Sequence, residues 1–259
     1  PASLMLLSLA TPAAAQVADQ LPKELSGVSV QQKLGNHVNL ALPFTTHTGE
    51  AITLRKFFGD GKPVILTLNY YRCRTLCSLE LNALVNGLKE LSFKAGTEFR
   101  VITASIDHRE TPKLAFGKRK RYLESLGQGE NVDWTFLTGS EASVRALAAQ
   151  VGFTFRYIKE QDEFAHPAVI FVLSPEGKIV RYLEGLGEPG KDGQGLNIPA
   201  RDLKFAIMDA SEGKVGSLLD KFIQSCFHYD PSLGRYGAFA MGIMRIGGIL
   251  TVVILAIVL

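Results

Sequence analysis

The chain alternates short apolar runs with longer segments of helical periodicity. Residues 63–68 form an apolar run that predicts a buried strand. The next segment predicts a helix, because leucine or valine occupies positions 79, 81, 84, 85, 88 and 91 on one broad face. Residues 98–106 predict the strand that follows.

Two further helices carry their own start signals. Thr111 and Pro112 predict a helix with a threonine cap and a proline in its first turn, ending near Gly127. After a short predicted strand at 133–137, Ser140 predicts the cap of a helix that continues to residue 150.

The remaining pattern adds strands and helices on both sides of this central part. A polar loop is expected at 159–165. Strands are expected at 38–42, 52–54, 153–157, 168–173 and 178–183, and helices at 55–58, 199–210 and 213–227. The order of elements predicts an α/β fold with a central mixed sheet flanked by helices, rather than a bundle or a sandwich.

Both ends of the chain are apolar. Residues 1–15 match the back half of a secretory signal peptide, the alternative being a frayed apolar end. Residues 236–259 carry a single charge and predict a C-terminal transmembrane helix. Between them we expect a linker at 16–36, one domain at 37–210 and a helical juxtamembrane segment at 211–235. The simplest interpretation is an exported domain with a membrane anchor.

Composition narrows the class of protein. Hydrophobic residues make up 46% and charged residues 20% of the chain, which provides for a packed core and is too apolar for disorder. The net charge is +3, and the one basic cluster, at 118–121, lies on a predicted helix and is typical of a solvated face. Nucleic-acid binding is therefore disfavoured.

The candidate chemistry lies where the first buried strand gives way to its helix. Cys73 and Cys77 are four residues apart there, near the positive end of the helix dipole, which lowers the pKa of a thiol. His166 precedes another predicted strand. Two thiolates and an imidazole suit Cu(I) and tolerate Cu(II), whereas a structural zinc site normally takes a fourth protein ligand. Arg72 and Arg74 flank Cys73 and offset part of the thiolate charge.

Plainer interpretations remain for the same residues. The two cysteines could be a buried free pair or a structural disulfide, and a lone histidine such as His166 is more often a satisfied loop residue. Asp107 is as readily a turn residue as a functional one. Cys226 and His228, near the apolar end, are most simply a buried cysteine and a solvated histidine, although they could form a second soft-metal pair.

Three motifs resemble one known family. The chain is similar to the Sco/SenC proteins, membrane-anchored thioredoxin-like copper chaperones of cytochrome c oxidase assembly, over roughly residues 42–209. The motifs are Tyr70-Tyr71-Arg72-Cys73-Arg74-Thr75-Leu76-Cys77, Ser105-Ile106-Asp107-His108-Arg109-Glu110-Thr111-Pro112 and Ala165-His166-Pro167.

The resemblance implies a role for each matching position. Cys73, Cys77 and His166 would be the copper ligands, the two cysteines would also cycle between dithiol and disulfide, and Asp107 would lie near the metal. It further implies an inner-membrane protein with its soluble domain on the periplasmic side. Its partner would be the copper-bearing subunit of cytochrome c oxidase or another copper carrier. Two departures affect affinity and redox potential: Arg74 replaces the family's usual proline, and Ala165 replaces a frequent aspartate.

Three functions therefore compete. The leading one is a copper-binding assembly factor that delivers copper to, or maintains the thiols of, a cytochrome c oxidase copper site. The others are a metal-free thiol–disulfide oxidoreductase or thiol peroxidase, and a structural accessory subunit of a respiratory complex. We also predict that the His166–Pro167 peptide bond is cis, as is frequent before the strand that passes the cysteine pair in thioredoxin-like folds.

Overall fold

The structure, a computed structural model, describes residues 27–73, 76–129, 131–185, 188–189, 196–215, 229–230 and 235–236. Of residues 76–77, 188–189, 229–230 and 235–236 it describes the backbone alone. The expected signal peptide, the expected membrane helix beyond residue 236, and both Cys226 and His228 lie outside this part of the chain. Within the described ranges, no helix has the length and apolar character needed to cross a bilayer.

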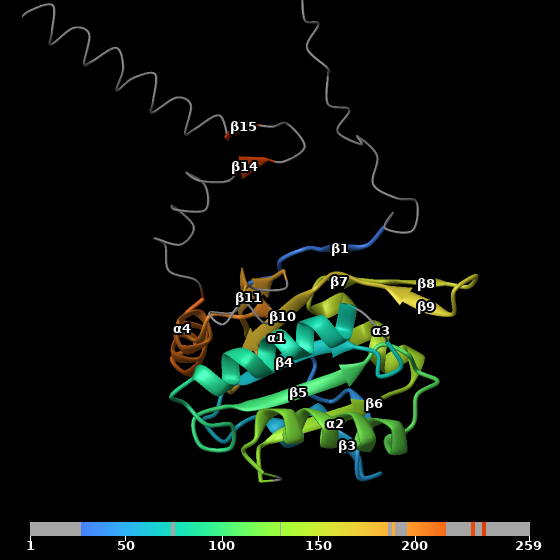
Figure 1. The fold of residues 1–259 in the computed structure, drawn as a ribbon, viewed down its shortest axis with the longest axis horizontal. Coiled ribbons are helices and arrows are strands. Elements are labelled where there is room, and N and C mark those ends of the chain that lie inside the picture. Colours follow the sequence, from blue (N-terminus) through green and yellow to red (C-terminus); the bar gives the residue numbers. More distant parts are fainter. Residues whose placement is uncertain are drawn as a thin grey trace, which may run out of the picture.

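A seven-stranded mixed sheet forms the centre of the domain (Figure 1). Its strand order is β11-β10-β4-β5-β6-β2-β3, in which β4 pairs with β5 and β5 with β6 in parallel and every other pair is antiparallel. The strands are β2 (Pro43–Thr46), β3 (Ala51–Thr53), β4 (Val64–Asn69), β5 (Arg100–Ser105), β6 (Trp134–Thr138), β10 (Val169–Leu173) and β11 (Ile179–Glu184). The predicted mixed sheet is confirmed.

Helices cover both faces of this sheet. The helices α1 (Leu76–Glu90), α2 (Pro112–Leu126) and α4 (Ala200–Ser211) share one apolar cluster with it, and α3 (Glu141–Gln150) shares the other. A short 3-10 helix, Leu54–Phe57, follows β3 as predicted. The α/β fold with a sheet between helices is therefore confirmed.

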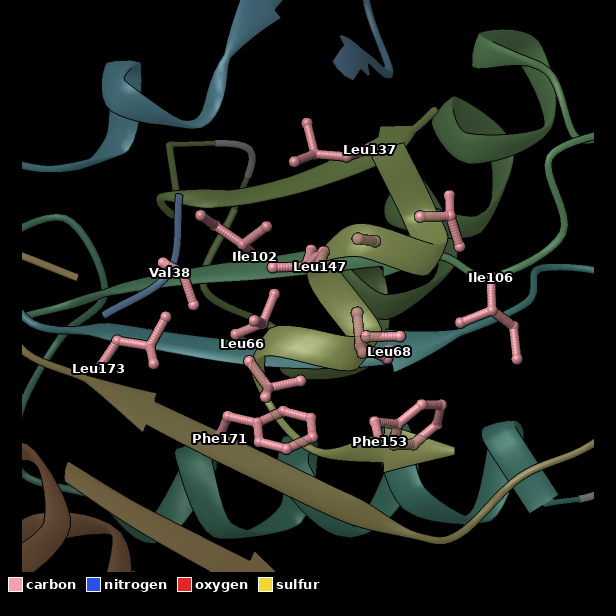
Figure 2. Packing of buried hydrophobic residues seen from close by; sticks show 14 of the residues in the cluster. Val38, Leu66, Leu68, Ile102, Ile106, Leu137, Leu147, Phe153, Phe171 and Leu173 are labelled. Carbon is pink, nitrogen blue, oxygen red and sulfur yellow. The ribbon is translucent and has the colours of Figure 1, made fainter. Parts of the chain in front are cut away.

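The two apolar clusters arise because successive residues of a strand point to opposite faces. On β4, Leu66 lies in the α3 cluster and its neighbour Ile65 lies in the cluster of the other helices. Figure 2 shows the α3 side, where Leu147 of the helix lies over Ile102 and Leu66 of the sheet. One exception to the predicted helix face is Leu79, which is 40% exposed.

Local start and stop signals are confirmed for two helices. The Thr111 hydroxyl accepts a hydrogen bond from the Leu114 amide, and Gly127 ends α2 in the left-handed conformation at φ 73°. The Ser140 hydroxyl accepts from the Ser143 amide at 3.2 Å and caps α3.

The N-terminal part of the domain differs from the prediction. Residues 38–42 form no strand; Val38 is buried but its amide bonds to the Gly177 carbonyl from a loop. The alternating apolar residues of this segment pack into the core without pairing in the sheet. Part of the expected linker also joins the domain, since β1 (Ser29–Val30) pairs with β7 (Phe153–Thr154).

A small hairpin replaces the predicted polar loop before His166. β8 (Arg156–Ile158) and β9 (Glu163–Ala165) pair with each other, so the strand predicted at 153–157 is in fact two separate strands. The hairpin projects from one side of the domain in Figure 1, away from α4. Two further short pairs join β12 (Glu188–Pro189) with β13 (Leu196–Asn197), and β14 (Tyr229–Asp230) with β15 (Arg235–Tyr236).

Candidate functional site

The cysteine segment lies at the strand-to-helix junction, as predicted. Cys73 follows β4 and is buried, with 8% of its surface exposed, and its amide donates to the Tyr70 carbonyl at 3.3 Å. Cys77 is the second residue of α1. Its side chain, and all of Arg74, lie outside the described part of the chain. Cys73 therefore precedes α1, and Cys77 lies in its first turn.

Tyr71 fixes this segment to the sheet below it. Its hydroxyl lies 2.6 Å from the Leu137 carbonyl and 3.0 Å from the Thr103 carbonyl, where β6 and β5 run side by side. Burial, with a smaller contribution from Glu110, raises the pKa of Tyr71 well above its usual value. The phenol therefore stays protonated and available as a donor.

Glu110 holds the backbone just before Cys73. Its carboxylate accepts from the amides of Tyr71 and Arg72, both at 2.8 Å, and from the Ser105 hydroxyl at 2.6 Å. Burial raises the pKa of Glu110, and these donors counteract part of that effect. The position of Cys73 is therefore set by a buried carboxylate that follows β5.

His166 lies at the end of the β8–β9 hairpin and is buried, with 3% of its surface exposed. Its ring packs edge-on to Tyr70 at 6.1 Å and against Phe153 at 5.9 Å, and Nδ1 lies 2.9 Å from the Pro167 carbonyl oxygen. Tyr70 therefore contacts His166 through its ring and Cys73 through its carbonyl.

The prediction of a cis bond before Pro167 is wrong, because no peptide bond among the described residues is cis. With a trans bond, the imidazole of His166 is held by its contacts with the rings of Tyr70 and Phe153.

Asp107 lies at the carboxyl end of β5 with its side chain fully buried. Arg109 donates two hydrogen bonds to it, from Nε at 2.7 Å and from Nη2 at 2.9 Å, and Arg72 forms a second ion pair with the same carboxylate. Burial alone would raise the pKa of Asp107, but the bonds from Arg109 and Arg72 outweigh burial and lower it to about 2. Asp107 is thus ionised and links two loops.

Sequence reasoning did not single out Glu80. This residue lies on α1 three positions after Cys77 and is almost fully buried. Oε2 accepts from Asn69 at 3.3 Å, whereas Oε1 has no hydrogen-bond partner among the described residues. Burial, aided by the nearby Cys73, raises the pKa of Glu80 well above its usual value. An acidic residue on an otherwise apolar helix face was the available signal.

The aromatic and charged residues of the hairpin were also missed. Tyr157 of β8 and Asp162 of the turn both contact Arg109, and Phe164 of β9 packs on Tyr70 at 5.5 Å. Their sequence signal is weak, because each partner lies about 50 or more positions away or belongs to another loop.

The donor atoms suit a soft metal ion, with a buried thiol at Cys73 and a buried imidazole at His166. No cluster of three or more histidine, cysteine or acidic side chains able to hold a metal occurs among the side chains that the structure describes. The Cys77 side chain is not one of these, so the three-ligand set stays a prediction. Ala165, which stands where the family frequently has an aspartate, lies in β9 opposite Arg156 of β8.

Comparison with known proteins gives a family and a set of similar folds. The family model SCO1/SenC matches residues 30–192. A candidate electron transfer protein from Aquifex aeolicus VF5 is 25% identical, with a TM-score of 0.56 over 70% of this chain and 96% of that one.

Two other solved structures share the fold. An SCO1/SenC family lipoprotein from Bacillus anthracis str. Ames is 14% identical, with a TM-score of 0.53 over 71% of this chain and 99% of that one. ScoI of Arabidopsis thaliana, solved with copper bound, is 17% identical, with a TM-score of 0.51 over 66% of this chain and 99% of that one. Among curated proteins, none matches the chain. The match over most of the thioredoxin-like domain shows that the chain belongs to the SCO1/SenC family.

Proposed function

We propose that this chain is an exported, membrane-anchored copper-binding protein. It delivers copper to, or maintains the thiols of, the copper site of cytochrome c oxidase. Cys73, Cys77 and His166 bind the copper ion as cargo, and Asp107 lies behind them in the charged network. The observation that carries the proposal is the position of Tyr70, whose carbonyl accepts from the Cys73 amide and whose ring packs edge-on to His166, so that two of the proposed ligand residues adjoin the same residue.

The chemistry of the donors supports transfer by ligand exchange. Thiolate and imidazole ligands bind Cu(I) well, and a partner that offers the same ligand types can replace them one at a time. The low exposure of Cys73 and His166 keeps water from competing for the ion. The same two cysteine sulfurs can pass between dithiol and disulfide, which would support the maintenance of a partner's thiols.

Family membership supports the choice of metal. The Arabidopsis ScoI structure contains copper, and its fold matches this domain. The apolar segments at residues 1–15 and 236–259 support export to the periplasmic side and anchoring in the inner membrane.

Titration of the purified chain with Cu(I) and with Cu(II) tests the proposal. We expect one copper ion per chain, and a His166→Ala variant should bind it at least about 100-fold more weakly, because losing a ligand costs no less than losing a residue that orients one. His108→Ala is the matched control, since His108 is an exposed histidine on the neighbouring loop and should leave the affinity unchanged. Equal affinities in the wild type and His166→Ala would remove His166 from the site.

The thiol–disulfide alternative is separated by the same preparations. If the chain binds no copper but reduces disulfides in a reaction that Cys73→Ser abolishes, the metal-free oxidoreductase is the better description. Co-purification with a respiratory complex in mild detergent, with no copper binding, would instead favour the accessory subunit.

A further inference from the structure

We propose that Arg109 is a positioning residue that holds the β8–β9 hairpin, and with it His166, in register with Cys73. This inference rests on the proposed copper site and names the residue that fixes the distance between its two sides.

One guanidinium contacts both strands of the hairpin and its turn. Nη1 of Arg109 lies 2.8 Å from Asp162 Oδ1 in the turn and 3.2 Å from the Tyr157 hydroxyl on β8. The Tyr157 hydroxyl also donates to Asp162 at 2.7 Å, so the three groups close a ring of hydrogen bonds. The Arg109 guanidinium carbon lies 4.8 Å from the Tyr157 ring centre and 5.7 Å from that of Phe164 on β9.

The hairpin needs such a support. Among the described strands, β8 and β9 pair only with each other, so no ladder of hydrogen bonds joins them to the main sheet. β9 ends at Ala165 and His166 follows directly. A shift of the hairpin therefore moves the imidazole by a similar distance.

The other side of the same guanidinium reaches the cysteine segment. Nε and Nη2 of Arg109 bind both oxygens of Asp107, and that carboxylate also pairs with Arg72, the residue before Cys73. A continuous chain of charged contacts thus runs from Arg72, the residue before Cys73, through Asp107 and Arg109 to Asp162 of the hairpin.

Only arginine can make this set of bonds. A planar fork of five N–H donors can bind Asp107 with two parallel bonds and still direct Nη1 at Asp162 and Tyr157. A lysine at position 109 would keep the positive charge, but it has a single donor atom and so cannot bond to Asp107 and to the hairpin at the same time.

Four variants of the full chain test the inference: Arg109→Leu, Arg109→Lys, Tyr157→Phe and the control Arg145→Leu. We expect Arg109→Leu to accelerate the loss of copper to a competing chelator about tenfold. The nitrogen hyperfine pattern of the imidazole in the electron paramagnetic resonance spectrum of the Cu(II) form should weaken. Arg109→Lys should be similarly defective, and Tyr157→Phe, which keeps the ring but loses the hydroxyl, should show a smaller change.

Two comparisons keep the result specific. Arg145 pairs with Glu141 and lies over Phe155, the residue before β8, but within the described part of the chain it forms no ion pair with Asp107 or Asp162, so Arg145→Leu should leave copper release unchanged. The dithiol–disulfide equilibrium of the cysteines against glutathione should be unaltered in Tyr157→Phe and Arg145→Leu, which leave both ion pairs of Asp107 intact. Loss of positive charge alone would favour a bound cation, so faster release from Arg109→Leu opposes a purely electrostatic effect.

Each failure has a distinct meaning. A wild-type chain that binds no copper overturns the proposed function. A wild-type chain that binds copper, together with Arg109→Lys and Tyr157→Phe variants that release it at the wild-type rate and keep the nitrogen pattern, overturns the role of Arg109 alone.

Discussion

The buried carboxylate of Asp107 links the two sides of the candidate site. Asp107 accepts two bonds from Arg109 and pairs with Arg72, and its side chain is fully buried. Removing a carboxylate from water is costly, and two guanidinium partners offset that cost well enough for the ionised form to persist.

The stability of the domain should therefore depend on pH through Asp107. Its pKa is about 2 in the folded protein against 3.8 for an ordinary aspartate, so the ion pairs stabilise the fold fully above pH 4 and are lost as the pH falls towards 2. The difference in the free energy of unfolding between the wild type and Asp107→Asn, from urea titrations, should shrink by about 2 kcal/mol between pH 5 and pH 2. If the difference in the free energy of unfolding stayed constant over this pH range, the arginine partners would not lower the pKa of Asp107.

A candidate residue could be predicted only where a reactive side chain stands next to a clear local pattern of strand or helix. Cys73 and Cys77 stand out because they lie where an apolar run gives way to a helical pattern. The hydrogen bond from Arg109 to Asp162 spans 53 positions, and the contact of Tyr70 with His166 depends on how a hairpin folds back. Such pairings follow from tertiary structure, and no local pattern encodes them.

At Gly87, helix α1 packs closely against its neighbours. A Cβ atom at Gly87 would lie 2.4 Å from the Ile198 carbonyl oxygen and 2.7 Å from a methyl group of Leu203 on α4. Because the nearer atom belongs to the backbone, it cannot move aside as a flexible side chain would.

Substitution at Gly87 should consequently reverse the usual preference of helices for alanine. Alanine gains about 1 kcal/mol of helix propensity over glycine, but overpacking costs about 1–3 kcal/mol, and a rigid backbone contact at 2.4 Å places Gly87 at the upper end of that range. Gly87→Ala should lower the free energy of unfolding by about 2 kcal/mol. Gly117→Ala on α2, where nothing lies within 4 Å, should raise it by about 1 kcal/mol. If both variants were stabilised in urea denaturation, the close contact of α1 with α4 would be disproved.

Elements with their own boundary signals were predicted well, and those defined by pairing were not. Thr111, Pro112 and Gly127 mark the ends of α2 in the sequence itself. Residues 38–42 alternate large apolar side chains with small or polar ones as a strand would, but they belong to a loop whose apolar side chains pack into the core. The β8–β9 hairpin lacks an apolar run, although Asp162, with φ 49°, is a residue type enriched at left-handed turn positions and was the available signal.

At the scale of the whole molecule, the sheet follows from the distribution of apolar runs. The parallel strands β4, β5 and β6 are nearly continuous in buried residues, as expected for strands covered on both faces. The loops after β4 and β5 then meet at one edge, and that edge carries Cys73 and Asp107. Family membership agrees with this arrangement over residues 30–192.

The proposed anchor can be tested on the whole chain. Residues 237–259 contain one charged residue, Arg245, and as a helix would be about 35 Å long, enough to cross the hydrocarbon core. After expression in bacteria, we expect the chain to stay with the membrane fraction through an alkaline carbonate wash. A chain ending at residue 236 should be released into the soluble fraction. Recovery of both forms in the soluble fraction would rule out the anchor.

The sharing of Asp107 by two arginines also constrains how this sequence can evolve. If either Arg72 or Arg109 is replaced, the carboxylate keeps one partner, but replacement of both leaves a buried charge uncompensated. The loss in the free energy of unfolding in the double variant should therefore exceed the sum of the losses in the two single variants. A lineage that has lost one arginine is thereby committed to keeping the other, unless the aspartate is replaced first.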